Sequence, residues 1–489
     1  MIYQSTRNNN EQVNSAQAVV KGIADDGGLY MLKDFSTLNF DYKSVLGLSS
    51  METAEKVLGA LLDDFSKEDM HRMVQEAYKG RFETDELTPV VKVGDNFVLE
   101  LFRGPTSAFK DVALSMLPRL MTQGRKMLLK EKDTVILTAT SGDTGKAALE
   151  GFHDVDGIKI IVFYPDGGVS AVQKAQMVTQ EGNNVCVCAV KGNFDDAQTG
   201  VKNAFADFSK SGFDSVELSS ANSINIGRLA PQVVYYFTAY SSLVKSGEIN
   251  VGDKINFVVP TGNFGDILAG YFAKCMGLPV GKLICASNAN NILTDFINTG
   301  IYDRRREFYK TISPSMDILV SSNLERLLYL LCDGNADEVA GYMKDLSEKG
   351  VYKVSDTLLA RIQESFTAAY CDDDTTLATI KEVYDKYGYL CDTHTAVAMR
   401  AALDGDFCEK TVVLSTASPY KFPVAVLSAL GEEPDSNEFA VMDKIHEITG
   451  VEIPKNLAGL NEKKVLHTDV IEKENMTEYV MKKVAQKKW

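Results

Sequence analysis

Three segments of the chain share one pattern: an apolar, β-branched run is followed by a turn of small polar residues and then by a helical stretch. They are TVILTATSGDTG (134–145), KINFVVPTGNFGD (254–266) and TVVLSTASPYKFP (411–423). Apolar runs of strand length that alternate with helical stretches are typical of parallel sheets covered by helices. The pattern therefore predicts an α/β fold.

Other parts of the chain complete this prediction. Further apolar runs predict strands at 159–165, 184–190 and 282–287. The first 90 residues instead carry apolar positions at helical spacing and predict a mainly helical N-terminal segment. We expect two parallel-sheet α/β domains to follow, at 91–240 and 241–489, the second with a largely helical insertion at about 290–400.

Composition and charge narrow the class of protein. The 489 residues are 45% hydrophobic and 24% charged, which is ordinary for a globular protein. The net charge of -16 disfavours nonspecific binding to nucleic acid or to an anionic membrane. No run of about 18 apolar residues is present, and residues 1–10 do not resemble a signal peptide. We expect a cytoplasmic protein without nucleic-acid or membrane partners; the sequence does not predict its oligomeric state.

The cysteines and histidines give no metal-binding pattern. None of the eight cysteines forms a CxxC pair. Cys186 and Cys188 alternate within a predicted strand, which favours two reduced thiols on one face of a core. The five histidines are scattered along the chain. We therefore predict no metal site.

Two of the polar turns could bind anions. In a parallel sheet, a glycine-rich turn after a strand lets backbone N–H groups and the next helix N-terminus approach an anion. A tight turn with Asp266 as a helix cap explains 262–266 equally well when this turn is taken alone. A second such turn at 141–145 favours a ligand with two anionic groups.

A lysine follows the strand-like run in LELFRGPTSAFKD (99–111). A lone lysine is most often a surface charge. Lys110, however, stands between a turn and an apolar helix. Partial burial near a cleft would lower its pKa and make it an amine suited to Schiff-base chemistry.

The order of the motifs resembles one known family. FRGPTSAFKD (102–111), ATSGDTG (139–145), ANSINIGR (221–228), PTGNFGD (260–266) and STASPYKF (415–422) occur in the family's order, with YQSTR (3–7), DDGGLY (25–30) and PSMDI (314–318) between or before them. The chain resembles the threonine synthase family of pyridoxal-phosphate (PLP) enzymes. The resemblance implies PLP fold type II, the fold group of tryptophan synthase β.

The resemblance implies roles for cofactor-binding residues. Lys110 would hold PLP as a Schiff base and act in catalysis. Thr416 would hydrogen-bond the pyridine nitrogen, with Ser415 as the fallback. The cofactor phosphate would lie in a cup formed by Gly262, Asn263, Phe264, Gly265 and Asp266.

Substrate contacts are implied in two other loops. The substrate carboxylate would bind at Thr140, Ser141, Gly142, Asp143 and Thr144. Candidates for the substrate phosphate are Asn222, Ser223, Asn225 and Arg228, although a polar loop that only shapes the cleft is equally compatible with these residues. Many enzymes of this fold have asparagine at the position of Asp143, facing the cofactor's phenolic oxygen, whereas the branch that this chain resembles carries aspartate. A carboxylate would repel that oxygen, so we expect Asp143 to be placed differently.

The implied reaction converts O-phospho-L-homoserine and water to L-threonine and phosphate by γ-elimination and β-addition of water. Two alternatives stay open. One is another lyase of the same fold, such as a serine or threonine dehydratase. The other is a catalytically silent homologue that binds PLP or a phosphorylated ligand, which the presence of both Lys110 and the cup disfavours.

Overall fold

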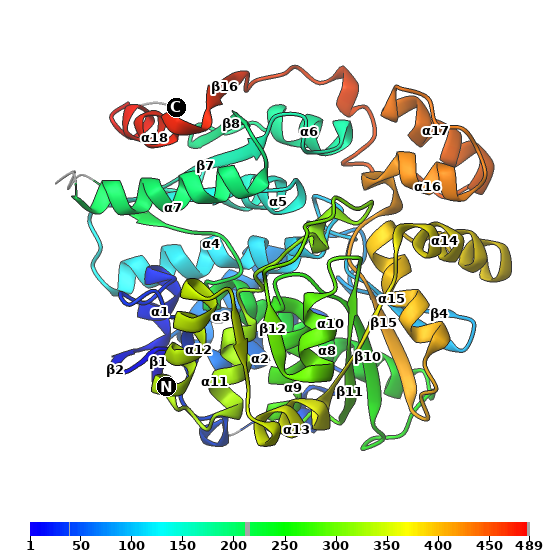
Figure 1. Ribbon diagram of the computed structural model, residues 1–489, viewed down its shortest axis with the longest axis horizontal. Helices are drawn as coiled ribbons and strands as arrows, with labels where there is room; N and C mark the ends of the chain where they lie inside the picture. Colours follow the sequence, from blue (N-terminus) through cyan, green and yellow to red (C-terminus); the bar gives the residue numbers. More distant parts are fainter. Residues whose placement is uncertain (39, 211–215, 487–489) are drawn as a thin grey trace.

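The computed structural model describes residues 1–38, 40–210 and 216–486. Two sheets form its two halves (Figure 1). The five-stranded sheet has the order β16-β8-β7-β6-β9, and its neighbouring strands are all parallel. Its strands are β6 (Asp133–Ala139), β7 (Ile158–Pro165), β8 (Val185–Lys191), β9 (Val216–Ser219) and β16 (Asp469–Glu472).

The six-stranded sheet has the order β14-β11-β10-β15-β5-β4. Only the edge pair β4–β5 is antiparallel. The strands are β4 (Val90–Val93), β5 (Asn96–Glu100), β10 (Ile255–Pro260), β11 (Val280–Ser287), β14 (Phe366–Tyr370) and β15 (Lys410–Ser415). All six strands that the apolar runs predict are present, and the α/β class with parallel sheets is confirmed.

Each sheet takes strands from both sides of residue 241, where the sequence places the division between the two α/β domains. β5 lies early in the chain but pairs with β15, and β16 lies near the C-terminus but pairs with β8. In Figure 1 the C-terminal β16 and α18 (Met476–Val484) lie beside β8 and α7 (Phe194–Lys210). Strand order depends on which apolar faces pack together, and a division of the chain by sequence alone cannot anticipate such returns.

The N-terminal segment is helical with a small sheet added. Its helices are α1 (Ser15–Lys21), α2 (Ser50–Leu61) and α3 (Lys67–Tyr78). Asn14 and Ser49 form capping boxes that fix where α1 and α2 begin. The antiparallel sheet β2-β1-β3, which the helical pattern did not predict, comprises β1 (Tyr3–Ser5), β2 (Asn8–Val13) and β3 (Tyr30–Leu32).

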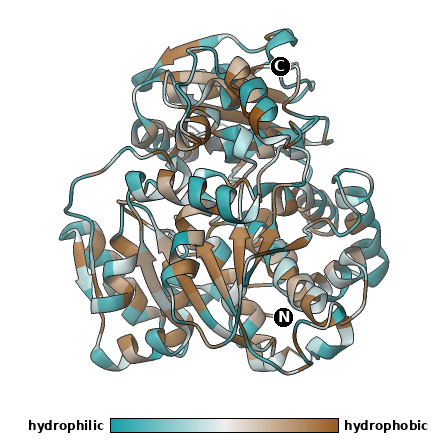
Figure 2. Cartoon of the chain, turned by 90° about the vertical axis from the view of Figure 1, so that its right-hand side faces the viewer, coloured by the Kyte–Doolittle hydropathy of each residue, from teal (hydrophilic) through white to brown (hydrophobic). Residues whose placement is uncertain are grey.

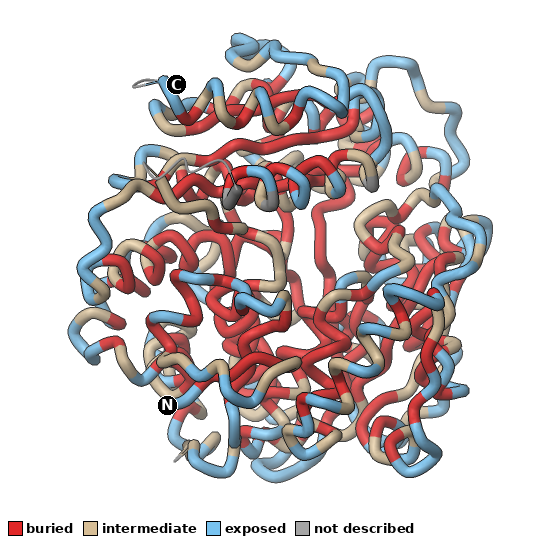
Figure 3. The backbone as a smooth tube through the Cα atoms, turned by 60° about the vertical axis from the view of Figure 1, so that its left-hand side comes forward, coloured by how far each residue is buried: buried red, intermediate tan, exposed pale blue. Residues whose placement is uncertain are grey.

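Helices cover both sheets. The central strands of the two large sheets are apolar and buried, and polar, exposed residues gather on the outer helices and loops (Figures 2 and 3). α4 packs against α1, α3, α5 and α8, so it lies at the centre of the molecule. The helices that lead from strands to the site are α4 (Lys110–Met127), α5 (Asp143–Phe152), α6 (Ala171–Val178), α8 (Ile226–Lys245) and α9 (Gly265–Cys275).

The region at 290–400 is mostly helical, as expected, but it also supplies β14 to the larger sheet and a two-stranded ladder of β12 (Ile301–Asp303) and β13 (Val351–Lys353). Its helices are α10 (Ile292–Thr299), α11 (Leu324–Leu331), α12 (Ala336–Glu348), α13 (Asp356–Ser365), α14 (Asp373–Tyr387) and α15 (Thr393–Asp404). After β15 follow the short 3₁₀ helix η4 (Pro419–Lys421), α16 (Pro423–Ala429) and α17 (Glu438–Thr449).

All eight cysteines are free thiols. Cys186 and Cys188 pack into one apolar cluster on a single face of β8, as the alternation predicts. In the described part of the chain, no helix has both the length and the apolar character needed to cross a membrane.

Candidate active site

The predicted lysine and the predicted ring-binding hydroxyl are adjacent because two loops pair where β5 and β15 end. The backbone N–H of Phe109 donates to the Thr416 carbonyl at 2.8 Å, and the N–H of Ser418 donates to the Ser107 carbonyl at 3.1 Å. An antiparallel bridge joins Ala108 to Ala417. This short ladder places Lys110, the first residue of α4, next to the end of β15.

Lys110 is buried and in a polar setting. Its Nζ lies 3.9 Å from Oδ2 of Asp143. Burial lowers the pKa of the Lys110 amine to about 8; nearby Asp143 opposes the shift, and Arg228 and Lys421 add to it. A large fraction of such an amine is uncharged at mildly alkaline pH, which is the state needed to attack an aldehyde or to accept a proton.

The predicted cup is a tight turn between β10 and α9. A Cβ on Gly262 would lie 2.8 Å from the carbonyl oxygen of Ser315, so only glycine fits without a backbone shift. Phe264 has a left-handed φ of 61° and directly precedes α9. The carbonyl of Asn263 accepts from both the backbone N–H and Nδ2 of Asn323, each at 3.1 Å. Asn323 therefore fixes the turn, and α9 begins directly after it, at Gly265.

The side chain of Asp266 contacts α8. Its Oδ1 accepts from the hydroxyl of Tyr235 at 2.5 Å and from that of Tyr236 at 3.0 Å. Burial raises the pKa of Asp266 to about 6, although both hydroxyls oppose the shift. Its Oδ2 is buried and has no partner among the described residues. Asp266 thus belongs to the cup through its backbone, while its carboxyl group ties α9 to α8.

The 140–144 loop divides into residues that shape it and residues with free groups. Thr140 Oγ1 accepts from the N–H groups of Gly142 and Gly145 at 2.9 and 2.8 Å, so its hydroxyl holds the turn. Ser141 and Thr144 are half-buried, and no hydrogen bond of either hydroxyl is found in the described parts of the chain. These two hydroxyls are available to an anion at the start of α5.

Asp143 does not face the site as a lone carboxylate. Its Oδ1 lies 3.1 Å from Nζ of Lys421 and accepts from Nε2 of Gln173 at 2.9 Å. Although burial acts in the opposite direction, Lys421, followed by Lys110, holds the pKa of Asp143 well below its usual range. The carboxylate is therefore paired with a buried cation, and its placement relative to the cofactor's phenolic oxygen stays a prediction.

The 222–228 segment contains one buried arginine with an N–H donor that has no hydrogen-bond partner among the described residues. Arg228 is buried and donates to the carbonyl of Ala221 at 2.6 Å, while its Nε has no partner among the described residues. Burial lowers the pKa of Arg228 to about 10. Asn225 caps α8 and bonds the carbonyl of Val19, so it has a structural task. Asn222 and Ser223 are half-buried at the same turn.

The two hydroxyls at the end of β15 differ in availability. Ser415 Oγ lies 3.0 Å from Thr395 Oγ1 and 3.5 Å from the Tyr389 hydroxyl. For the buried Thr416 hydroxyl, no hydrogen bond occurs within the described ranges. The contacts favour Thr416 over Ser415 as the residue free to bind a ligand nitrogen.

Three residues near these loops were not predicted from sequence: Lys421, Asn323 and Arg326. Arg326 is fully buried and donates to the carbonyls of Tyr30, Ser223 and Ile224 and to the side chain of Asn323. Through Asn323 it joins the cup to the 222–225 turn. Lys421 lies inside a motif quoted above, but its burial depends on tertiary packing that no local pattern reveals.

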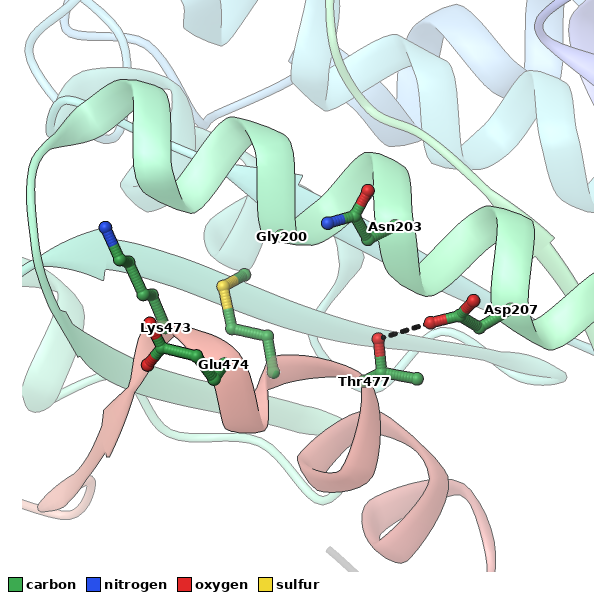
Figure 4. A pocket seen from close by; sticks show the side chains of 7 residues that line it. Gly200, Asn203, Asp207, Lys473, Glu474 and Thr477 are labelled. Atoms are coloured by element: carbon green, nitrogen blue, oxygen red, sulfur yellow. Dashed lines mark hydrogen bonds between the residues drawn. The ribbon is translucent and has the colours of Figure 1, made fainter.

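A polar cavity of about 380 Å³ lies elsewhere, between α7 and the C-terminal segment (Figure 4). Thr477 donates to Asp207 at 3.2 Å on its wall. None of the predicted site residues lines it: its lining residues are Gly200, Asn203, Asp207, Lys473, Glu474, Met476 and Thr477.

The donor set fits PLP. A buried primary amine of lowered pKa suits the aldehyde, a glycine cradle at the N-terminus of α9 suits the phosphate, and the free hydroxyl of Thr416 suits the ring nitrogen. The fold and this set of groups define a PLP-dependent enzyme. Residues 87–352 match the family model described as pyridoxal-phosphate dependent enzyme.

Comparison with known proteins narrows the class. Residues 2–78 match the model described as threonine synthase N terminus, and residues 395–480 match threonine synthase, C-terminal. The chain belongs to the threonine synthase family. It is 40% identical to the threonine synthase of Pseudomonas aeruginosa over 445 residues, which is 89% of this chain and 92% of that protein.

A solved structure and a longer relative agree with this assignment. The PLP-bound threonine synthase of Brucella melitensis is 39% identical and superposes with a TM-score of 0.88 over 99% of this chain and 100% of that chain. Human threonine synthase-like 1 is 40% identical over 432 residues, or 85% of this chain. The chain spans 58% of the length of that longer protein. The expected family, fold type and cofactor are confirmed.

Proposed function

We propose that this chain converts O-phospho-L-homoserine and water to L-threonine and phosphate, with PLP bound covalently to Lys110. The observation that carries the proposal is the meeting of a buried amine of lowered pKa, an anion cup and a buried arginine with an unpartnered Nε. The family supports the same reaction, because the match to the threonine synthase of Pseudomonas aeruginosa covers 92% of that protein.

The chain's residues would hold the cofactor at three points. Lys110 provides the covalent attachment, the 262–266 backbone receives the phosphate at the N-terminus of α9, and Thr416 bonds the ring nitrogen. A neutral hydroxyl at that nitrogen does not enforce its protonation, as a carboxylate would. When bound, PLP supplies the electron sink that stabilises negative charge on the substrate carbon beside the amino group.

The substrate would be held at both ends. The hydroxyls of Ser141 and Thr144 and the N-terminus of α5 receive the carboxylate. Arg228, with Asn222 and Ser223 beside it, receives the phosphate, because a guanidinium can bind phosphate oxygens in pairs. Burial strengthens this attraction, since water does not screen it.

Lys110 is the proposed base. The amine would be set free when the substrate amino group takes its place; in its uncharged state, which a pKa of about 8 makes accessible at mildly alkaline pH, it would then accept the Cα proton. Loss of a Cβ proton then allows the Cγ–O bond to break, and the departing phosphate stays near Arg228. Water adds its hydroxyl to Cβ, and protons return to the carbon chain to give threonine.

The test is a paired assay of phosphate release and threonine formation from O-phospho-L-homoserine. We expect the two products in equal amounts, and neither from Lys110→Ala. Formation of a 2-oxoacid from serine or threonine without phosphate release would identify a dehydratase instead. The absence of any product, with PLP retained, would identify a catalytically silent homologue.

A second variant tests the phosphate site. Arg228→Gln removes a charge-assisted hydrogen bond worth about 1.5–3 kcal/mol, so we expect kcat/KM to fall by about 10–150-fold with PLP retained. Arg125→Gln is the matched control, because Arg125 is also a buried arginine but bonds Thr134 and the carbonyl of Lys132. An equal loss of PLP and of activity in Arg228→Gln would assign Arg228 a structural role.

A further inference from the structure

Lys421 is a fully buried lysine with a complete set of partners. Its Nζ lies 3.1 Å from Asp143 Oδ1, donates to the carbonyl of Thr106 at 3.1 Å, and donates to Oε1 of Gln176. An ammonium group has three N–H donors, and all three have an acceptor. Burying a charged ammonium costs desolvation free energy even when it is fully hydrogen-bonded. Packing alone therefore does not explain why a lysine occupies this position.

The partners of Lys421 belong to the loops that form the site. Thr106 begins the turn that leads into Lys110, and its own N–H and hydroxyl donate to Asp111 at 2.8 and 2.5 Å. Asp143 begins α5 and has its second oxygen 3.9 Å from the Lys110 amine. Lys421 itself ends η4, just after β15 and Thr416. One ammonium therefore joins three loops that surround the reactive amine.

We propose that Lys421 is a positioning residue that holds the Asp143 carboxylate and keeps it from pairing more closely with the Lys110 amine, which lies 3.9 Å away. The proposal rests on the function proposed above. Lys421 and Gln173 both contact Oδ1, with Lys421 at 3.1 Å, whereas the Lys110 amine lies farther away, 3.9 Å from Oδ2. Without Lys421, Lys110 is the nearest remaining cation. Asp143 would then bind the lysine ammonium and oppose its conversion to a free amine.

The test measures the amine itself. In the full-length chain freed of PLP, the acetylation rate of Lys110 is followed against pH by peptide mass spectrometry. We expect Lys421→Met to move the midpoint upward by about one pH unit or more, since an opposite charge within ~4–6 Å shifts a pKa by ~1–3 units. Asp143→Asn should move it downward. The double variant, which has neither charge, should lie between the two single variants.

Two further variants separate positioning from folding. Lys421→Arg keeps the charge and should leave the midpoint closer to wild type than Lys421→Met does. Lys146→Met is the matched control: Lys146 lies on the same helix as Asp143 but pairs with Glu150 at 3.2 Å. It should leave the midpoint unchanged. If Lys421→Met does not fold, Lys421→Gln replaces it, because it removes the charge but keeps an N–H donor for the Thr106 carbonyl, and the same upward shift is expected.

The outcomes decide between the two roles. A midpoint that is the same in wild type, Lys421→Met and Asp143→Asn would overturn the proposal and leave Lys421 as a structural residue. This readout needs neither PLP nor substrate, so a failure of the proposed reaction would appear in the threonine assay and not here.

Discussion

Replacing each of the two glycines of the cup by alanine should affect the stability of the fold differently. A Cβ on Gly262 would meet the backbone oxygen of Ser315 at 2.8 Å and the Cα of Met316 at 3.3 Å, so the backbone must shift. A Cβ on Gly265 would meet only Asn323 Nδ2 at 3.4 Å and Ser223 Cβ at 3.6 Å, which are ordinary contacts. Neither glycine has a left-handed φ, so alanine is allowed at both by its backbone.

The magnitudes follow from these distances. Gly262→Ala forces two backbone segments apart and should destabilise the fold by about 1–3 kcal/mol. Gly265→Ala should change the free energy of unfolding by less than about 1 kcal/mol, since the first turn of α9 accommodates a methyl group. If a phosphate lies against this turn, however, the methyl group displaces it from the backbone N–H groups. The loss of one hydrogen bond to a charged group, about 1.5–3 kcal/mol, weakens PLP binding about 10–150-fold.

The assay pairs denaturant unfolding of the PLP-free chain with a PLP titration followed by visible absorbance. The informative variant is Gly265→Ala, because its folding and its cofactor affinity should separate. Wild-type PLP affinity in a normally folded Gly265→Ala protein would refute the reasoning and place the phosphate elsewhere. A large loss of stability in Gly265→Ala would show that the glycine is needed by the fold rather than by a ligand.

Two further predictions concern the ends of β15 and α4. Thr416→Val should lower kcat/KM by at least about tenfold (~1.4 kcal/mol) without loss of stability. Ser415→Ala should mainly lower stability, because Thr395 and Tyr389 lose a hydroxyl partner. The reverse pattern would assign the contact with the ring nitrogen to Ser415. In the PLP-free chain, the rate at which Lys110 reacts with an aldehyde should rise with pH and reach half its maximum near the pKa of about 8. A midpoint at the ordinary 10.5 would show that the amine is not desolvated as the structure describes.

The sequence predicts the strands well because their signal is local. Each predicted strand is a short apolar run bounded by a turn, and such a run is buried on both faces of a covered parallel sheet. The order of the strands is not local. The pairing of β5 with β15 and of β16 with β8 joins segments hundreds of residues apart, so the position of Lys110 beside Thr416 follows from topology and not from spacing.

Some site residues were likewise predictable from local motifs, and others depend on tertiary packing. Lys110, the cup glycines and Arg228 stand in motifs whose residue types match the chemistry, and resemblance to a family assigns them roles. The roles of Thr140 and Asn225 were harder to predict from the sequence, because a hydroxyl or amide in a polar turn can either bind a ligand or shape the turn. The contacts of both residues are with the protein's own backbone. Lys421 and Arg326 were missed because a charged residue reads as exposed until the packing around it is known.

The helix α8 connects the two anion-binding parts of the site. It carries Arg228 in its first turn and Tyr235 two turns later, and Tyr235 with Tyr236 holds the carboxyl group of Asp266 at the start of α9. Arg326 joins the same two regions from the other side, through Asn323 and the 223–224 carbonyls. These two sets of contacts link the cup to the segment that carries Arg228. Under the proposed function, this arrangement would set the separation of two phosphates, one on the cofactor and one on the substrate, although neither loop alone specifies that distance.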